Sequence, residues 1–129
     1  MSKFIFGSAS EKNLQGVHPD LVQLARAALA LSPVDFRITE GRRSMARQRD
    51  LLREGKSQTL KSRHLTGHAI DVVALPGNVV SWDMKYYKQI ADAFKQASEG
   101  LTIPIEWGGD WKTLVDGPHF QLPVRDYPE

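Results

Sequence analysis

The sequence predicts a small α+β domain. Apolar residues recur at helical spacing in some segments and at every second residue in others, and the two patterns follow one another in mixed order. The chain has 129 residues, which fits one domain, and no repeat, low-complexity segment or linker divides it. We therefore expect residues 1–129 to fold as a single domain around one hydrophobic core.

The composition narrows the chemistry that the chain can perform. Hydrophobic residues make up 41% and charged residues 25% of the sequence, as in ordinary globular proteins, which argues against disorder. The chain contains no cysteine. This excludes disulfides, thiolate zinc sites and a cysteine nucleophile, so a metal ion would be held by His, Asp, Glu and water alone.

Charge and hydropathy exclude two further classes of partner. The formal net charge is only +2, and the arginines between residues 37 and 53 alternate with acidic residues, which favours a solvated helix face over a nucleic-acid site. The apolar stretch at the N-terminus is too short for a signal-peptide core, and no run approaches the ~20 residues of a membrane span. We expect a soluble protein, made in the cytoplasm, that binds no nucleic acid and does not insert into membranes.

Two helices are predicted in the first quarter of the chain. The spacing of Ser8 and Glu11 is that of a capping box, which predicts a short helix over residues 8–16. A proline in the first turn and apolar residues at helical spacing predict a second helix over residues 19–31, stopped by a Ser-Pro pair. His18 precedes this helix and is interpreted as a surface or capping residue.

A strand and a third helix follow. Residues 34–39 alternate apolar and polar side chains, the pattern of a half-buried strand. Ser44 is a suitable N-cap for a helix over residues 45–55. Arg43 and Gln48 then lie near the turn that joins the two elements. From these residues alone, a hydrated arginine at the start of the helix is the simpler interpretation of Arg43.

The middle of the chain is predicted to alternate between loop, strand and helix. Residues 56–63 are polar and unpatterned and indicate a surface loop. Residues 72–75 continue a buried strand, which a Pro-Gly-Asn turn ends. Ser81 is a candidate cap for a long amphipathic helix over residues 82–98, and Gly100 is the expected stop.

Two strands are predicted near the C-terminus. Residues 102–107 form the first, which Pro104 confines to a sheet edge or a bulge because proline has no amide hydrogen. A glycine-rich turn separates it from the last strand, residues 119–122. Alternation along that strand sets His119 and Gln121 on one face.

Residues 62–71 contain two histidines and an aspartate, and this combination makes metal binding the first functional hypothesis. His64 and His68 are four residues apart, the spacing that pairs two imidazoles on a helix. Leu65 stands where a metalloprotease helix of this kind carries its glutamate, and Gly67 disfavours a helix. The alternative is that His64 on a loop and Asp71 on a strand share one ion while His68 points elsewhere.

A third ligand would complete a hydrolytic site. Zinc held by His64, Asp71 and His119 would keep one position open for water, lower the pKa of that water from 15.7 toward ~7 and polarise a substrate carbonyl. Asp116 could act as the base, and Arg43 could stabilise an oxyanion or bind a carboxylate. Spacing alone leaves zinc hydrolysis and structurally placed polar residues both open.

Three motifs in order resemble the zinc D,D- and L,D-peptidases of peptidase family M15. This family includes VanY-type D-alanyl-D-alanine carboxypeptidases and phage L-alanyl-D-glutamate endopeptidases, the endolysins. Its Ser-x-His-x-x-Gly-x-Ala-x-Asp pattern is met by Ser62, His64, Gly67, Ala69 and Asp71. Its acidic-x-x-His and Gly-x-Arg-Ser elements, the latter with a following Gln, are met by Asp116 and His119 and by Gly41, Arg43, Ser44 and Gln48.

The resemblance implies a fold and a set of roles. The fold would be an antiparallel sheet flanked by helices, similar to Hedgehog proteins and D-Ala-D-Ala peptidases. The implied roles are zinc ligation by His64, Asp71 and His119, general base catalysis on the zinc-bound water by Asp116, transition-state or substrate binding by Arg43, and support by Ser62 and Gln48. His68 falls at a variable position of the pattern.

The endolysin branch is the closer resemblance. Residues 6–14, the Ala-Leu-x-Leu-Ser-Pro segment and an aspartate at position 116 are similar to the phage enzymes. This implies hydrolysis of the L-alanyl-D-glutamate bond of the peptidoglycan stem peptide by a phage or prophage lysis enzyme. It also implies a monomer without a separate wall-binding domain, which waits in the host cytoplasm until a holin admits it to the periplasm and cell wall.

Two other functions share the same motifs. A D-alanyl-D-alanine carboxypeptidase would use the same catalytic groups with a different substrate pocket. A non-catalytic zinc or wall-binding module, as occurs among Hedgehog-type relatives, would have a defective base. Asp116 and Arg43 are both present, which disfavours the second alternative.

Overall fold

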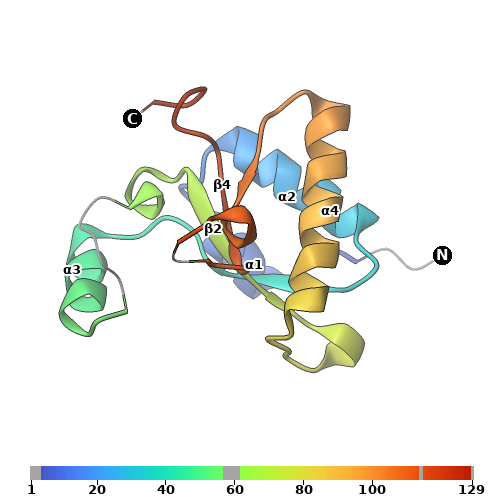
Figure 1. Cartoon of the computed structure of the whole chain (residues 1–129), viewed down its shortest axis with the longest axis horizontal. Coiled ribbons are helices and arrows are strands. Elements are labelled where there is room, and N and C mark those ends of the chain that lie inside the picture. Colours follow the sequence, from blue (N-terminus) through green and yellow to red (C-terminus); the bar gives the residue numbers. More distant parts are fainter. Residues whose placement is uncertain (1–3, 57–61, 114, 129) are drawn as a thin grey trace.

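The computed structural model describes residues 4–56, 62–113 and 115–128. Over these residues the chain forms a four-stranded sheet with α-helices and short 3₁₀ helices in its connections (Figure 1). In chain order the elements are α1 (Ser8–Asn13), α2 (Pro19–Leu31), β1 (Phe36–Glu40), α3 (Met45–Arg53), η1 (Arg63–Thr66), β2 (Ala69–Ala74), η2 (Pro76–Asn78), α4 (Met84–Leu101), β3 (Glu106–Trp107), η3 (Gly108–Asp110) and β4 (His119–Gln121).

Strand β2 lies inside the sheet, between β1 and β4. The strand order is β1-β2-β4-β3, and every pair is antiparallel. Asp71 of β2 faces His119 of β4 on one side and Glu40 of β1 on the other. The topology therefore brings the end of β1 and the start of β4 to the two sides of Asp71.

The hydrophobic core joins this sheet to the long helices. α2 and α4 pack against each other, α4 contacts β2, and α1 contacts β1. Phe94 of α4 stacks on Phe120 of β4 with ring centroids 4.1 Å apart, and its ring lies 5.8 Å from that of Phe36 on β1. Burying each such side chain contributes roughly 1.5–3 kcal/mol. The predicted α+β class is confirmed.

The helices α2 and α3 begin at the predicted residues because their N-caps are satisfied. His18 Nδ1 accepts a hydrogen bond from the Asp20 amide at 3.1 Å, and Ser44 Oγ accepts one from the Arg47 amide at 3.1 Å. α3 stands apart from α2 and α4, at the left of Figure 1. The capping interpretation of His18 is confirmed. α3 ends at Arg53 with Glu54 as its C-cap, and Gly55 follows in the left-handed conformation with φ 76°, as expected of a glycine that closes a helix.

The predicted N-caps of two other helices are wrong, although α1 begins at Ser8 as expected and ends at Asn13, before the expected residue 16. α1 has Gly7 as its N-cap without any side-chain bond, so the predicted capping box does not form. α4 begins at Met84, where Asp83 Oδ1 accepts a hydrogen bond from the Lys85 amide at 3.0 Å. Ser81, the predicted cap, bridges to Ala74 instead. The helix also continues through the expected glycine stop and ends at a left-handed threonine, residue 102, with φ 57°.

The predicted strand over residues 102–107 is too long. Only Glu106 and Trp107 pair with β4, because Thr102 caps α4 and Pro104 has no amide hydrogen to donate. The expected edge position is confirmed, since β3 is the last strand in the order. Most of the predicted loop over residues 56–63 lies outside the described residues.

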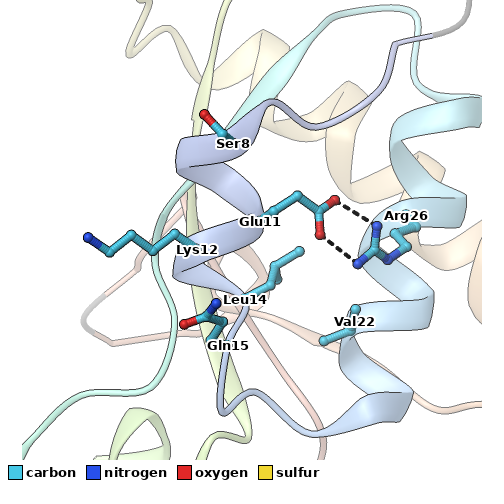
Figure 2. A pocket seen from close by; sticks show the side chains of 7 residues that line it. All are labelled: Ser8, Glu11, Lys12, Leu14, Gln15, Val22 and Arg26. Carbon is cyan, nitrogen blue, oxygen red and sulfur yellow. Dashed lines mark hydrogen bonds and ion pairs between the residues drawn. The ribbon is translucent and has the colours of Figure 1, made fainter.

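A hollow of about 760 Å³ separates α1 from α2 on the surface (Figure 2). Glu11 and Arg26 form a two-point ion pair across it, with both contacts at 2.7 Å. Both side chains are exposed, so the pair contributes about 0.2–1 kcal/mol and serves to tie the two helices together. No described helix is both long and apolar enough to cross a membrane.

Candidate active site

The structure brings His64, Asp71 and His119 together. His64 Nε2 lies 3.4 Å and His119 Nδ1 lies 3.3 Å from Asp71 Oδ1, and the three donor atoms are all within 4.8 Å of one another. Asp71 and His119 meet because they are cross-strand partners in the sheet. His64 reaches them from η1, five residues before the start of β2.

The orientation of the His64 ring is set by the turn after β1. His64 Nδ1 donates a hydrogen bond to the Gly41 carbonyl at 2.8 Å, and the Arg43 amide donates to the His64 carbonyl at 2.9 Å. A carbonyl can only accept, so the neutral ring carries its hydrogen on Nδ1. The other ring nitrogen, Nε2, faces Asp71.

The His119 ring has the opposite arrangement. Its Nε2 lies 2.8 Å from Gln121 Oε1, so a hydrogen on Nε2 leaves the lone pair of Nδ1 facing Asp71. Gln121 is itself held by Glu106, whose Oε2 accepts hydrogen bonds from Gln121 Nε2 at 3.4 Å and from Trp111 Nε1 at 2.8 Å. The sequence analysis assigned no role to Gln121, although its alternation with His119 placed both on one face.

The three residues could hold a metal ion, and their donor atoms are of the kinds that zinc accepts. Two imidazole nitrogens and a carboxylate oxygen are donors that zinc accepts, and bonds of about 2.0–2.2 Å in a tetrahedral arrangement separate donor atoms by roughly 3.3–3.5 Å. Both separations from Asp71 lie in this range. The second nitrogen of each ring also donates a hydrogen bond to an acceptor, as in most metal-binding histidines.

Contacts among Asp71 and the two histidines shift pKa values toward the charged forms of Asp71 and His119. Burial opposes ionisation of Asp71, but hydrogen bonds with His119 and His64 hold its pKa well below the usual range. Burial also opposes protonation of His119, but the hydrogen bond and charge of Asp71 outweigh it and raise its pKa. The carboxylate of Asp71 thus favours the protonated form of His119.

Asp116 lies outside the three-donor cluster but within its electric field. Burial, followed by the negative charge of Asp71, raises the pKa of Asp116. The backbone holds it in place, since the Asp116 amide donates to the Gly108 carbonyl at 3.0 Å and the His119 amide donates to the Asp116 carbonyl at 3.2 Å. A carboxyl group with a raised pKa is suited to exchanging a proton near neutral pH.

Arg43 is held in place by the other residues of the predicted motifs. Its Nη1 donates to Gln48 Oε1 at 2.7 Å and to Ser62 Oγ at 3.5 Å, and its Nε pairs with Glu40. Its Nη2 lies 3.8 Å from Asp71 Oδ2. Gln48 is fully buried, so it provides a fixed support. The structure places Ser62 and Gln48 beside the arginine rather than in the cluster.

His68 lies away from the cluster, as the strand interpretation predicted. Its Nδ1 lies 2.7 Å from Thr66 Oγ1, and its ring centroid lies 5.5 Å from that of His18. The helical pairing with His64 does not form, because η1 ends at Thr66 and β2 begins at Ala69.

Two motif glycines permit the close packing that positions these loops. A Cβ atom at Gly67, where φ is +78°, would lie 2.3 Å from the Gly16 carbonyl oxygen, and one at Gly41 would lie 2.0 Å from the Asn13 carbonyl oxygen. The His18 amide also donates to the Gly67 carbonyl at 2.8 Å. The turn between α1 and α2 therefore supports both loops that carry site residues.

Known proteins are similar to this chain in sequence along most of their length. The chain is 38% identical over 117 residues to the L-alanyl-D-glutamate peptidase of Escherichia phage T5, covering 88% of this chain and 85% of that protein. It is 32% identical over 123 residues to the peptidoglycan L-alanyl-D-glutamate endopeptidase CwlK of Bacillus subtilis (strain 168), covering 82% and 73% of the two chains.

A solved structure extends the similarity to the fold. The crystal structure of the Serratia marcescens L-Ala D-Glu endopeptidase ChiX is 60% identical in sequence and superimposes with a TM-score of 0.93, over 99% of this chain and 96% of that one. The profile of the phage L-alanyl-D-glutamate peptidases matches residues 1–122. The resemblance to the phage endopeptidases is thus confirmed, and the chain belongs to the phage L-alanyl-D-glutamate peptidase family.

Proposed function

We propose that this protein is a zinc-dependent endopeptidase that hydrolyses the L-alanyl-D-glutamate bond of the peptidoglycan stem peptide. The observation that carries the proposal is the cluster of His64, Asp71 and His119, whose donor atoms lie within 4.8 Å of one another. Relatives named for this activity support the choice of substrate.

We assign a different role in hydrolysis to each group of residues in the site. His64, Asp71 and His119 would hold the ion, and a bound zinc ion lowers the pKa of a coordinated water and polarises a carbonyl. Asp116 accepts a proton from the attacking water at its carboxylate and returns it to the nitrogen of the leaving glutamyl residue. Arg43 donates hydrogen bonds to the oxygen that gains negative charge, and Gln48 and Ser62 keep its guanidinium in place.

The biological role proposed for this activity is lysis of a bacterial host by a phage or prophage. The protein would act as a monomer, held in the host cytoplasm until a holin opens the membrane. Expression in the bacterial cytoplasm, with and without a co-expressed holin, tests this role. Rapid lysis only in the presence of the holin is expected, and equal lysis without it would contradict the need for release.

Mapping the digested stem peptides by mass spectrometry tests the activity itself. The expected products are fragments with a new D-glutamyl N-terminus and their L-alanyl counterparts. Release of terminal D-alanine with the L-alanyl-D-glutamate bond intact would show a D-alanyl-D-alanine carboxypeptidase instead. Intact peptides after treatment with the zinc-loaded protein would favour a non-catalytic binding module.

A further inference from the structure

A hollow of about 690 Å³ lies beside the turn that follows β1, next to residues that neighbour the cluster of His64, Asp71 and His119. Its lining comes from the turn after α1, the turn between β1 and α3, and η1, and it includes Gln15, Arg42, Arg43 and Leu65. Arg43 reaches from the hollow toward Asp71, and Leu65 directly follows His64. A substrate whose scissile bond lies at the cluster can therefore extend into this hollow.

Arg42 lines the hollow, where its guanidinium group can bind an anionic ligand. It is exposed, and it forms no ion pair with any residue in the described part of the chain, whereas Arg43 is engaged by Glu40 and Gln48. A Cβ atom at Gly16 would lie 3.0 Å from Arg42 Cδ and 3.4 Å from its Cβ, so the aliphatic stem rests on the backbone at that glycine. This packing restrains the stem and leaves the guanidinium to a ligand.

The charged groups near the cluster differ on the two sides of β2. Arg42 and Arg43 follow β1 on one side, where the carboxylate of Glu40 is already paired with Arg43. Asp116 precedes β4 and Glu106 lies on β3, on the other side. An anionic group of the substrate is attracted to the β1 side and repelled from the β4 side. The hollow beside Arg42 therefore complements the acidic part of a peptide substrate.

The substrate of the proposed function has an anionic group next to the scissile bond. In an L-alanyl-D-glutamate bond, the amine of the glutamyl residue is acylated by L-alanine. The glutamyl residue still has two carboxyl groups, and only one of them is needed to join the next residue of the peptide. We propose that Arg42, in the hollow lined by Arg43 and Leu65, binds the free carboxylate of the D-glutamyl residue and makes it a determinant of specificity. This inference rests on the proposed function, because it names the subsite for the leaving half of that substrate.

Paired substrates test the proposal. Two N-acylated L-alanyl-D-glutamyl peptides are compared, extended through the same carboxyl group, with the other carboxyl free in one and amidated in the other. The wild-type protein is expected to prefer the free acid about tenfold in kcat/KM, and Arg42→Gln to bring this ratio close to one, mainly through KM. Arg42→Lys, which keeps the charge, should retain part of the preference and so exclude a misfolded turn.

The matched control is Arg37→Gln, which removes the same charge from an exposed residue of β1 outside the hollow and should leave the ratio unchanged. An unaltered preference in Arg42→Gln, or a wild-type protein that cleaves acid and amide equally, would overturn the subsite while leaving the proposed function intact. A wild-type protein that cleaves neither peptide, nor intact stem peptides, would overturn the proposed function and the subsite with it.

Discussion

His119 Nε2 lies 2.8 Å from Gln121 Oε1, and this contact determines which nitrogen of the imidazole faces Asp71. Because Gln121 Nε2 donates to Glu106, its amide oxygen is the atom directed at His119. An acceptor there keeps the ring hydrogen on Nε2 and frees Nδ1 to bind a cation. Gln121 thus orients the His119 ring within the cluster of three candidate metal ligands.

Replacing Gln121 should weaken metal binding. Gln121→Leu removes the acceptor that holds the His119 ring, so the affinity for Zn²⁺ should fall about 10–100-fold, as measured by competition with a chromophoric chelator. Gln23→Leu, at an exposed position of α2, makes the same chemical change away from the site and should bind zinc normally. Wild-type affinity in the Gln121 variant would show that the contact does not position the ring.

Substitution of Asp116 and of His119 should separate catalysis from metal binding. Asp116→Ala is expected to keep one zinc per chain and to lose about 10²–10⁴-fold in cleavage rate, because the base is absent. His119→Ala should lose both zinc and activity. Zinc content by metal analysis, measured alongside wall lysis, distinguishes the two. Full lysis by the Asp116 variant would refute the base assignment, and retained stoichiometric zinc in the His119 variant would refute the ligand assignment.

A glycine at position 67 should be required for two reasons, namely its positive φ angle and the close approach of the Gly16 carbonyl oxygen. Gly67→Ala adds a Cβ atom 2.3 Å from the Gly16 carbonyl oxygen at φ +78°, whereas Gly55→Ala adds one at φ +76° with no atom within 4 Å. The angle alone costs about 1–2 kcal/mol, and the clash should add about 1–3 kcal/mol. Urea unfolding measures the difference, and equal losses of stability would contradict the packing role.

The stability of the protein should depend on pH in opposite ways with and without zinc. His119 has a raised pKa in the folded metal-free protein, so its contribution is complete below the unfolded pKa near 6.5 and is lost as the pH rises through the folded value. The depressed pKa of Asp71 gives a contribution that is complete above the unfolded pKa near 3.8 and is lost as the pH falls below it.

Metal-free protein should therefore become less stable as the pH rises above about 6.5, and His119→Gln should remove this loss. Zinc-loaded protein should instead gain stability over the same range, because zinc binding requires a deprotonated ring. Thermal unfolding with and without a chelator, at several pH values, measures both slopes. Identical slopes in the two states would contradict a shared role of His119 in the ion pair and in metal binding.

The sequence could predict the elements that carry the site because their signals are local. The β-branched run after Asp71 and the glycine at position 67 excluded a helical His64–His68 pair, and the structure places His64 on η1 and Asp71 on β2. His119 could be proposed as the third ligand from the turn and short strand around it, and the register of β2 and β4 brings it opposite Asp71.

The features that were mispredicted depend on tertiary contacts. Ser81 and Asp83 are both good caps, and the choice between them follows from the bridge of Ser81 to Ala74, which no local pattern encodes. The role of Gln121 likewise needs the rotation of the His119 ring, whereas alternation reveals only that both residues share a face.

The most direct test of the proposed mechanism is the zinc dependence of L-alanyl-D-glutamate cleavage. Protein stripped by a chelator is titrated with Zn²⁺ while the new D-glutamyl N-terminus is quantified by mass spectrometry. The stripped protein should not cleave, and the rate should rise with added zinc and reach its plateau at one ion per chain. Full cleavage of the same bond by the stripped protein would contradict a zinc-dependent mechanism.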